Sequence, residues 1–447
     1  MKNYLILLTL ILFSCQKLNN NFNFNKQQDL KTSQINNNIS DSQPSSSQNP
    51  SQNLLIANNL KTNKVNPKKI QVALFLPFSG KNKDLGFSLF NTATISLFYN
   101  DSNGLIDLVL FDSKDNPKDS EKVFKEIIDK KIKIVIGPIF SSSVEAIEKL
   151  ALQNNITVIS LSNNQNLINK TNKEGGIFIS GILPETQIEK IVNYSISQGK
   201  LNFAIIAPSN QYGKTITELF KRFVRAKQAN FITSEFYDNS FKDLDRVVER
   251  TINAFVIPEN LKKNKNDKNI VINDYDRIYP QVILIPESGK TASKIIASIK
   301  KQNTQERPYQ ILGTSQWDDK SVYDSNLIDT WFPAPENEKF SNLENFYYKK
   351  FDKFPPRIAS IAYDMVALIA EIANQKQGQT PAFKDFVEFK NGNINGYQGV
   401  DGTFRFLPNG LVQRNLSILK ISVTNQAGNW FETIEKGNDS FIDYKKN

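Results

Sequence analysis

From Ile70 onward, short and almost continuously apolar runs alternate with amphipathic stretches, and this alternation constrains the fold more than any other feature of the chain. The apolar runs of the first part are Val72–Phe78, Ile106–Phe111, Ile132–Ile136 and Ile156–Leu161. Runs this continuous are typical of strands that are buried on both faces of a sheet. Strands that alternate with helices predict a parallel, doubly wound α/β sheet.

The stretches between these runs have the signatures of helix starts. Asn116-Pro117 is followed by Asp119 and Glu121, so a helix is predicted with Pro at its first position and acids in its first turn. The sequence Ser142-Ser143-Val144-Glu145 has the form of a capping box and predicts a second helix.

The alternation restarts after Pro184 and predicts a second sheet, so the fold class is α/β with two doubly wound lobes. The Lys- and Asn-rich stretch 260–276 has no apolar face, and we interpret it as a surface insertion. The predicted strands are Phe203–Ala207, Phe231–Phe236 and Val282–Ile285, and the predicted helices are 185–198, 214–226, one that begins at Leu244, and 291–300.

The residue types available exclude most catalytic chemistries. The sequence contains no His and one Cys, Cys15. Ser-His-Asp and Cys-His catalysis, His-ligated metal sites and internal disulfides are therefore excluded. No carboxylate pair is spaced for general acid-base work. We expect a protein that is not an enzyme and that holds no cofactor and no metal.

The first residues have the order of an export signal, with Lys2, an apolar run from Tyr4 to Phe13, and then Ser14-Cys15. The run is too short to span a bilayer. Its end, Leu12 to Cys15, resembles a bacterial lipobox, which implies removal of residues 1–14 and acylation of Cys15. The alternative is an ordinary secretory signal that happens to contain Cys. Because Gln16 is not Asp, the resemblance also implies sorting to the outer membrane, with the acyl chains as a stable anchor facing the periplasm.

Residues 15–69 are predicted to form a disordered, lipidated tether. Asn, Gln and Ser make up 26 of the 45 residues from 16 to 60, and such a segment cannot offset the entropy cost of ordering. Its lysines suit either a solvated tail or contact with anionic lipid. Residues 16–69 carry seven Lys against two Asp, which is half of the net charge of +10. The remainder is near charge balance, so no nucleic-acid partner is expected.

Several motifs occur in a defined order from about Lys69 to Ile421. The early motifs are VALFLPFSG at 72–80, Leu85-Gly86, Gly137-Pro138 with Ser141-Ser142-Ser143, and Tyr212-Gly213. They resemble the type I periplasmic-binding fold of leucine/isoleucine/valine receptors. The later motifs are GTSQWDD at 313–319, WFPAP at 331–335, ASIAYD at 359–364 and GVDGTFRF at 399–406. These resemble the penicillin-binding-protein activator lipoproteins built on that fold.

The resemblance implies that the chain passes between the lobes more than once. The first lobe is then expected over 70–184 and 333–390, the second over 185–332 and 391–430, and a C-terminal tail over 431–447. Parallel sheets place ligands beyond the carboxyl ends of their strands. We therefore expect the loops after Phe78, Ile136 and Leu161 to face a cleft between the lobes.

Candidate binding residues follow from the resemblance, together with other roles that each could have. Ser141 and Ser142 lie at a predicted helix start, where free N–H groups attract a carboxylate, although Ser142 is better explained as the cap of its own helix. Ser160 and Ser162 match positions that hold a ligand's ammonium and carboxylate, or they form a turn. Tyr212 matches an aromatic residue that closes over the ligand, or it is an ordinary buried Tyr. The full candidate set is Ser79, Ser141, Ser142, Ser160, Ser162, Tyr212, Gln316 and Asp318.

The sequence departs from the amino-acid receptors where those carry an acid for the ligand's ammonium group. The comparable stretch reads Thr314-Ser315-Gln316-Trp317, and Asp318 and Asp319 lie just beyond it. An ammonium group that is buried without a partner costs several kcal/mol, so this change indicates a changed or lost ligand. The pair Tyr363-Asp364 is interpreted as part of a packed helix over 361–372 rather than as a site.

Two functions remain open from the sequence. The activator resemblance implies a non-enzymatic lipoprotein that contacts a peptidoglycan synthase, and the altered ligand loop favours it. The receptor resemblance implies a solute-binding protein that delivers an amino acid or similar small molecule to an ABC transporter permease. The same fold supports both roles, so the fold alone does not decide between them.

Overall fold

The computed structural model describes residues 69–441 apart from positions 115, 169–174, 239, 259–275, 319–323, 390–395 and 424–429. The predicted signal peptide, Cys15 and almost all of the predicted tether lie outside the described residues, as does most of the predicted insertion at 260–276. The described part contains two α/β lobes, each with its own buried core.

The first lobe is built on a five-stranded parallel sheet in the order β2-β1-β3-β4-β5. The four predicted strands of this lobe are confirmed, and β5 is a fifth that no predicted run covered. In β1, Val72 pairs with Leu108 on one side and Ile134 on the other, which explains why this strand is apolar throughout. The strands are β1 (Ile70–Leu76), β2 (Ile106–Asp112), β3 (Ile134–Ile136), β4 (Thr157–Ser160) and β5 (Gly176–Ile179).

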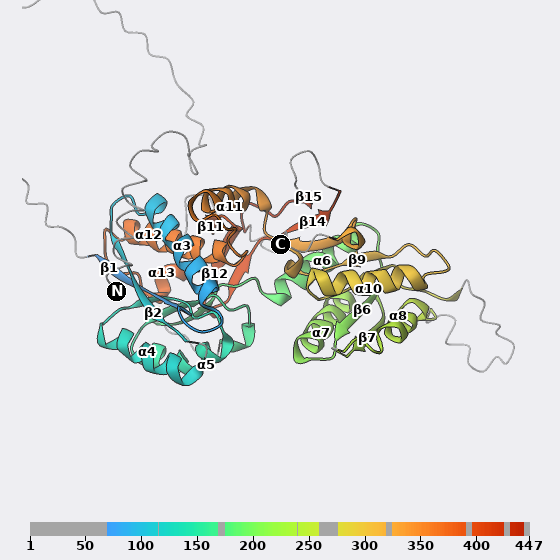
Figure 1. Cartoon of the computed structure of the whole chain (residues 1–447). Helices are drawn as coiled ribbons and strands as arrows, with labels where there is room; N and C mark the ends of the chain where they lie inside the picture. The colour runs from blue at the N-terminus through green and yellow to red at the C-terminus, as the bar shows by residue number, and fades with distance from the viewer. Residues whose placement is uncertain are drawn as a thin grey trace, which may run out of the picture. The chain divides into compact units, whose positions relative to one another are not determined.

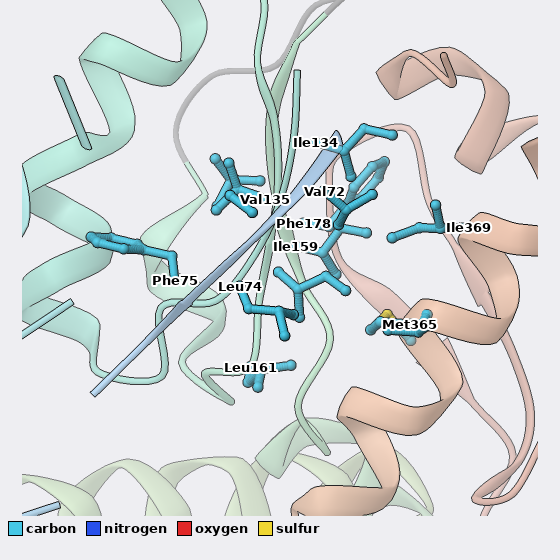
Figure 2. Close-up of a cluster of buried hydrophobic side chains, with 14 of the residues drawn as sticks. Val72, Leu74, Phe75, Ile134, Val135, Ile159, Leu161, Phe178, Met365 and Ile369 are labelled. Carbon is cyan, nitrogen blue, oxygen red and sulfur yellow. The ribbon is translucent and has the colours of Figure 1, made fainter. Parts of the chain in front are cut away.

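Helices cover both faces of this sheet. Helices α3 (Lys83–Asn100) and α12 (Ala359–Gln375) lie on one face, and α4 (Pro117–Asp129) and α5 (Ser141–Gln153) lie on the other (Figure 1). Figure 2 shows Met365 and Ile369 of α12 directed toward the strands, with Phe75 on the opposite side of the sheet. Two further helices, α11 (Asn337–Phe351) and α13 (Phe383–Val387), also pack into the cores of this lobe.

The predicted start of α4 is confirmed. The Asn116 side chain accepts a 3.0 Å hydrogen bond from the Asp119 backbone N–H, and Pro117 is the first helical residue.

The second lobe is built on a seven-stranded sheet in the order β15-β14-β10-β9-β8-β6-β7. Strands β6 to β10 are parallel, whereas β14 runs antiparallel to both β10 and β15. The strands are β6 (Asn202–Pro208), β7 (Asn230–Tyr237), β8 (Val282–Leu284), β9 (Gln310–Leu312), β10 (Trp331–Ala334), β14 (Ser417–Ile421) and β15 (Phe431–Glu435).

Successive residues of β6 point to opposite faces of this sheet, as the strand period requires. Ala204 and Ile206 share a core with α8 (Leu244–Asn253) and α10 (Gly289–Gln302). Phe203, Ile205 and Ala207 share the other core with α6 (Pro184–Ser197) and α7 (Gln211–Ala226).

The C-terminal region divides between the lobes differently from the expected boundaries. Strands β11 (Tyr397–Gly399), β12 (Gly402–Phe406) and β13 (Val412–Arg414) fall in the range expected for the second lobe, yet they pack into the core of the first. Aromatic contacts account for this, because the ring centroids of Phe178 on β5 and Phe406 on β12 lie 4.3 Å apart. Residues 431–435, expected to be a tail, form β15 at the edge of the second sheet.

Candidate functional site

The strands of the first sheet are parallel, so their carboxyl-end loops gather at one edge. Asp112, which ends β2, links two of these loops there. Its Oδ1 accepts the Phe78 backbone N–H at 2.9 Å, and its Oδ2 lies 2.8 Å from Lys114 Nζ. Lys114 Nζ also donates a 3.3 Å hydrogen bond to the hydroxyl of the candidate Ser79. Burial would raise the pKa of Asp112, but hydrogen bonds from Lys114, Ser79 and the backbone lower it below its usual value.

Two more candidates, Ser141 and Ser162, meet at the same edge. Their hydroxyl oxygens lie 3.4 Å apart, and Asn164 Nδ2 donates to Ser141 Oγ at 3.3 Å. The backbone N–H of Asn164 donates to Ser162 Oγ at 3.2 Å. This hydroxyl and amide cluster, formed by Ser141, Ser162 and Asn164, contains both donors and acceptors and suits a small polar group such as a carboxylate.

The predicted capping box at Ser142 is wrong. Helix α5 begins at Ser141, and its N-cap is Phe140, two residues before the predicted cap and without a side-chain cap hydrogen bond. Ser142 is the second residue of the helix and is exposed, so its hydroxyl is not used as the helix cap.

Ser160 faces inward rather than toward the edge. Its side chain is fully buried, and its hydroxyl donates to the Pro138 carbonyl at 2.9 Å while accepting the Ser162 backbone N–H at 3.1 Å. These bonds give Ser160 the role of a turn former that positions Ser162.

In the second lobe, the candidate Tyr212 at the start of α7 and the candidate Gln316 in the loop after β9 lie together. Gln316 Nε2 donates a 2.8 Å hydrogen bond to the Tyr212 hydroxyl. Burial raises the pKa of Tyr212, although hydrogen bonds with Thr314 and Gln316 oppose that rise. Beside them, Glu287 follows β8, and its carboxylate accepts the hydroxyl of Tyr237. Its backbone carbonyl accepts the Trp317 indole N–H at 2.7 Å.

The candidate Asp318 is not presented to a ligand. Its side chain is 3% exposed, and its Oδ2 accepts a 2.6 Å charge-assisted hydrogen bond from Arg357 Nε. Arg357 Nη1 also contacts Asp401 and donates to Ser360 Oγ at 2.9 Å. Burial raises the pKa of Asp318, and the attraction of Arg357 opposes this. Asp318 is therefore part of a buried ion-pair network.

A second buried pair lies next to this network. Asp364 on α12 accepts the Val400 backbone N–H at 2.7 Å and lies 3.8 Å from Arg414 Nη1. Arg414 Nη1 in turn donates to the Asp401 carbonyl at 3.1 Å. The interpretation of Tyr363 and Asp364 as residues of a packed helix is confirmed, since both are buried in α12.

Some polar residues that organise these loops were not among the sequence candidates. Asp112 ends β2, Lys114 lies two residues after it, and Asn164 lies two residues after the candidate Ser162, so their positions carried a usable signal. Arg357 gave none, because it stands between Pro356 and a helix and its partners are distant in the chain.

Within the described residues, no group of three or more Asp, Glu, Cys or His side chains is placed to hold a metal ion. The helices described in the structure also include none with the length and apolarity needed to cross a membrane.

Comparison with known families and sequences extends these observations. A family model described as periplasmic binding protein matches residues 69–429. An uncharacterised Rickettsia prowazekii protein is 24% identical over 355 residues, which cover 79% of this chain and 86% of that protein. The penicillin-binding protein activator LpoA of Vibrio cholerae is 22% identical over 188 residues, which cover 42% of this chain and only 30% of LpoA.

Solved structures with a similar fold include a putative branched-chain amino acid ABC transporter protein from Rhodospirillum rubrum. Its TM-score is 0.64 at 14% identity, over 82% of this chain and 100% of that one. Another is a solute-binding protein of an ABC transporter from Rhodopseudomonas palustris, in complex with 3,4-dihydroxybenzoic acid. Its TM-score is 0.59 at 15% identity, over 85% of this chain and 99% of that one. These likenesses confirm the two-lobed fold that the motifs predicted.

Proposed function

Because the chain belongs to the periplasmic binding protein family, whose members are binding proteins, we propose that it acts without catalysis as a regulator of a peptidoglycan-synthesising penicillin-binding protein. The family match supports a location in the cell envelope. The partial similarity to LpoA supports the choice of partner.

The observation that carries the proposal is the state of Asp318. The loop after β9 offers Gln316 at the place where amino-acid receptors are expected to carry an acid, and the nearby Asp318 is buried against Arg357. Glu287, in the loop after β8, already accepts the hydroxyl of Tyr237. An ammonium group entering this edge would have to displace one of these bonds, which disfavours an amino-acid ligand.

A second candidate function is a solute receptor for an ABC transporter. It is favoured by the hydroxyl and amide cluster of Ser141, Ser162 and Asn164, which suits a carboxylate, and by the solute-binding proteins that share the fold. A ligand that has a carboxylate but no ammonium group would bind this cluster, and it would not need the acid that is missing from the loop after β9.

We also propose that the protein is anchored by acylated Cys15 in the outer membrane, with residues 16–69 as the tether that presents the folded part to the periplasm. The export-signal pattern and the Leu12–Cys15 motif support this anchor.

The proposed function is tested with a purified bifunctional penicillin-binding protein from the same organism and its lipid-linked disaccharide substrate. Adding this chain should raise the rate of glycan polymerisation or cross-linking severalfold. The fold-matched Rhodospirillum rubrum protein serves as the control and should have no effect. An unchanged rate, together with no detectable binding to any of the organism's penicillin-binding proteins, would reject the regulator proposal in favour of the receptor.

A further inference from the structure

Arg357 contacts residues of both lobes. Asp318 belongs to the second lobe, since it follows Trp317, whose side chain is buried in the core with α8 and α10. The other partners, Asp401 and Ser360, belong to the first lobe. The guanidinium group therefore joins the loop after β9 to the start of α12 and to the turn between β11 and β12.

The first lobe holds Arg357 on several sides. Its guanidinium carbon lies 4.0 Å from the centre of the Phe340 ring on α11, a cation–π contact. Ser360 Oγ bonds to Asp401 Oδ2 at 2.7 Å, so Asp401 is fixed as well. The first lobe alone thus orients Arg357. Asp318 is the single partner that the second lobe contributes to it.

The burial of these groups makes the link between the lobes costly to break. The side chains of Arg357, Asp318 and Asp401 are 14%, 3% and 1% exposed. Separating Asp318 from Arg357 would leave a buried carboxylate without its counter-charge, which is strongly unfavourable. The pair of Arg250 with Glu235, by contrast, connects two elements of the second lobe, and its side chains are 44% and 19% exposed.

We propose that Arg357 is an interlobe clasp that sets the resting position of the second lobe against the first. The clasp acts on the loop over residues 313–318, which also carries Gln316, so it positions one wall of the candidate site without contacting a ligand. The angle between the lobes is then set by the protein itself rather than by a bound molecule. This inference does not depend on which partner or ligand the protein has.

The test measures the distance between the lobes in solution. Because Cys15 is the only Cys in the sequence, a chain that begins at Gln16 accepts spin labels at two introduced sites alone, Lys118→Cys on α4 and Lys301→Cys on α10. Double electron–electron resonance should give one narrow distance distribution. Asp318→Ala removes the interlobe partner and leaves Arg357 with Asp401 and Ser360, so the distribution should become at least twice as wide.

The matched control is Glu235→Ala, which removes an Arg–carboxylate pair inside the second lobe and should leave the distribution unchanged. Asp318→Asn keeps an acceptor for Arg357 Nε and should give an intermediate width. If Asp318→Ala does not fold, Asp318→Asn is compared with the parent in its place. A folded variant whose mean distance and width match those of the parent would overturn the clasp. A second readout is amide hydrogen exchange, which should rise at least tenfold over residues 313–317 in Asp318→Ala and stay unchanged in the control.

Discussion

Gly399 packs directly against the carboxylate of Asp364, and a Cβ atom on Gly399 would lie 2.4 Å from Asp364 Oδ2. The carboxylate cannot move aside freely, because it accepts the backbone N–H of Val400 and lies beside Arg414. The close approach places the turn between β11 and β12 on α12, and with it Asp401, the partner of Arg357.

Replacing Gly399 by Ala should therefore lower the free energy of unfolding by about 2 kcal/mol, as expected for overpacking a buried site. Urea denaturation followed by circular dichroism measures the change. Gly199→Ala is the control, because Gly199 has a φ of +75° but open space around its Cβ position. It should cost about 1 kcal/mol, for the left-handed backbone alone. An equal or smaller loss in Gly399→Ala than in Gly199→Ala would contradict the packing argument.

Asp364 should make stability depend on pH in the mildly acidic range. Burial, with the nearby charge of Asp401, raises the pKa of Asp364 to about 7 against the opposing attraction of Arg414. The folded protein then keeps a proton that the unfolded chain releases near pH 4. The contribution of Asp364 to the free energy of unfolding is therefore full below about pH 4 and is lost as the pH rises to 7.

This contribution is measured by urea denaturation at several pH values between 4 and 7, for the parent chain and for Asp364→Asn. The variant is expected to be less stable throughout, because an amide cannot accept both backbone N–H groups. Its stability should fall less steeply with pH than that of the parent. Parallel pH profiles would show that Asp364 does not titrate in this range.

Leucine, isoleucine and valine should not bind tightly. The loop after β9 supplies Gln316 and a buried Asp318 where an ammonium group needs an accessible acid. Isothermal titration calorimetry should show no dissociation constant of 1 µM or tighter, which corresponds to about 8 kcal/mol. Tight binding that is lost in Ser141→Ala would place the ligand at the hydroxyl and amide cluster and support the receptor function.

Cys15→Ser should abolish membrane anchoring. The thiol is the atom that the lipobox resemblance assigns to the acyl chain, and a hydroxyl does not replace it there. Cell fractionation should find the variant as a soluble or uncleaved form, and intact mass measurement should find no acyl groups. Ser14→Ala, which keeps a small residue before Cys15, is the control and should fractionate like the parent. Normal processing and membrane retention of Cys15→Ser would rule out the lipoprotein proposal.

Strands β1–β4 and β6–β8 and most helices were predictable because they depend on local patterns. The run at 72–78 is apolar because β1 lies inside a parallel sheet, and Asn116 with Pro117 contains a complete helix start within a few residues. The short strand β5 was missed, since four residues that begin with Gly give too weak a pattern. The start of α5 was misplaced by two residues, because three consecutive serines do not show where the helix begins.

The candidate site was predictable only in part, because some of its residues pair with partners that are distant in the chain. Ser141, Ser162 and Tyr212 could be singled out through the resemblance to the receptor family, and the convergence of the carboxyl ends of parallel strands indicated which loops line the cleft. Asp318 could not be assigned correctly, since its partner Arg357 is 39 positions away, and Arg357 lies 44 positions from Asp401. Pairings over such distances depend on how the lobes fold together, which no local pattern records.

The division of the chain between the lobes bears on the order in which the protein can fold as it is synthesised. Strand β10 lies between β9 and β14, yet β14 follows only after α11, α12, α13 and β11–β13 have completed the first lobe. A chain that emerges with its N-terminus first exposes one edge of β10 until Ser417–Ile421 arrives to cover it. An uncovered strand edge is prone to pair with other chains. A stop codon at Ser417 would therefore leave an aggregation-prone protein rather than a slightly shortened one.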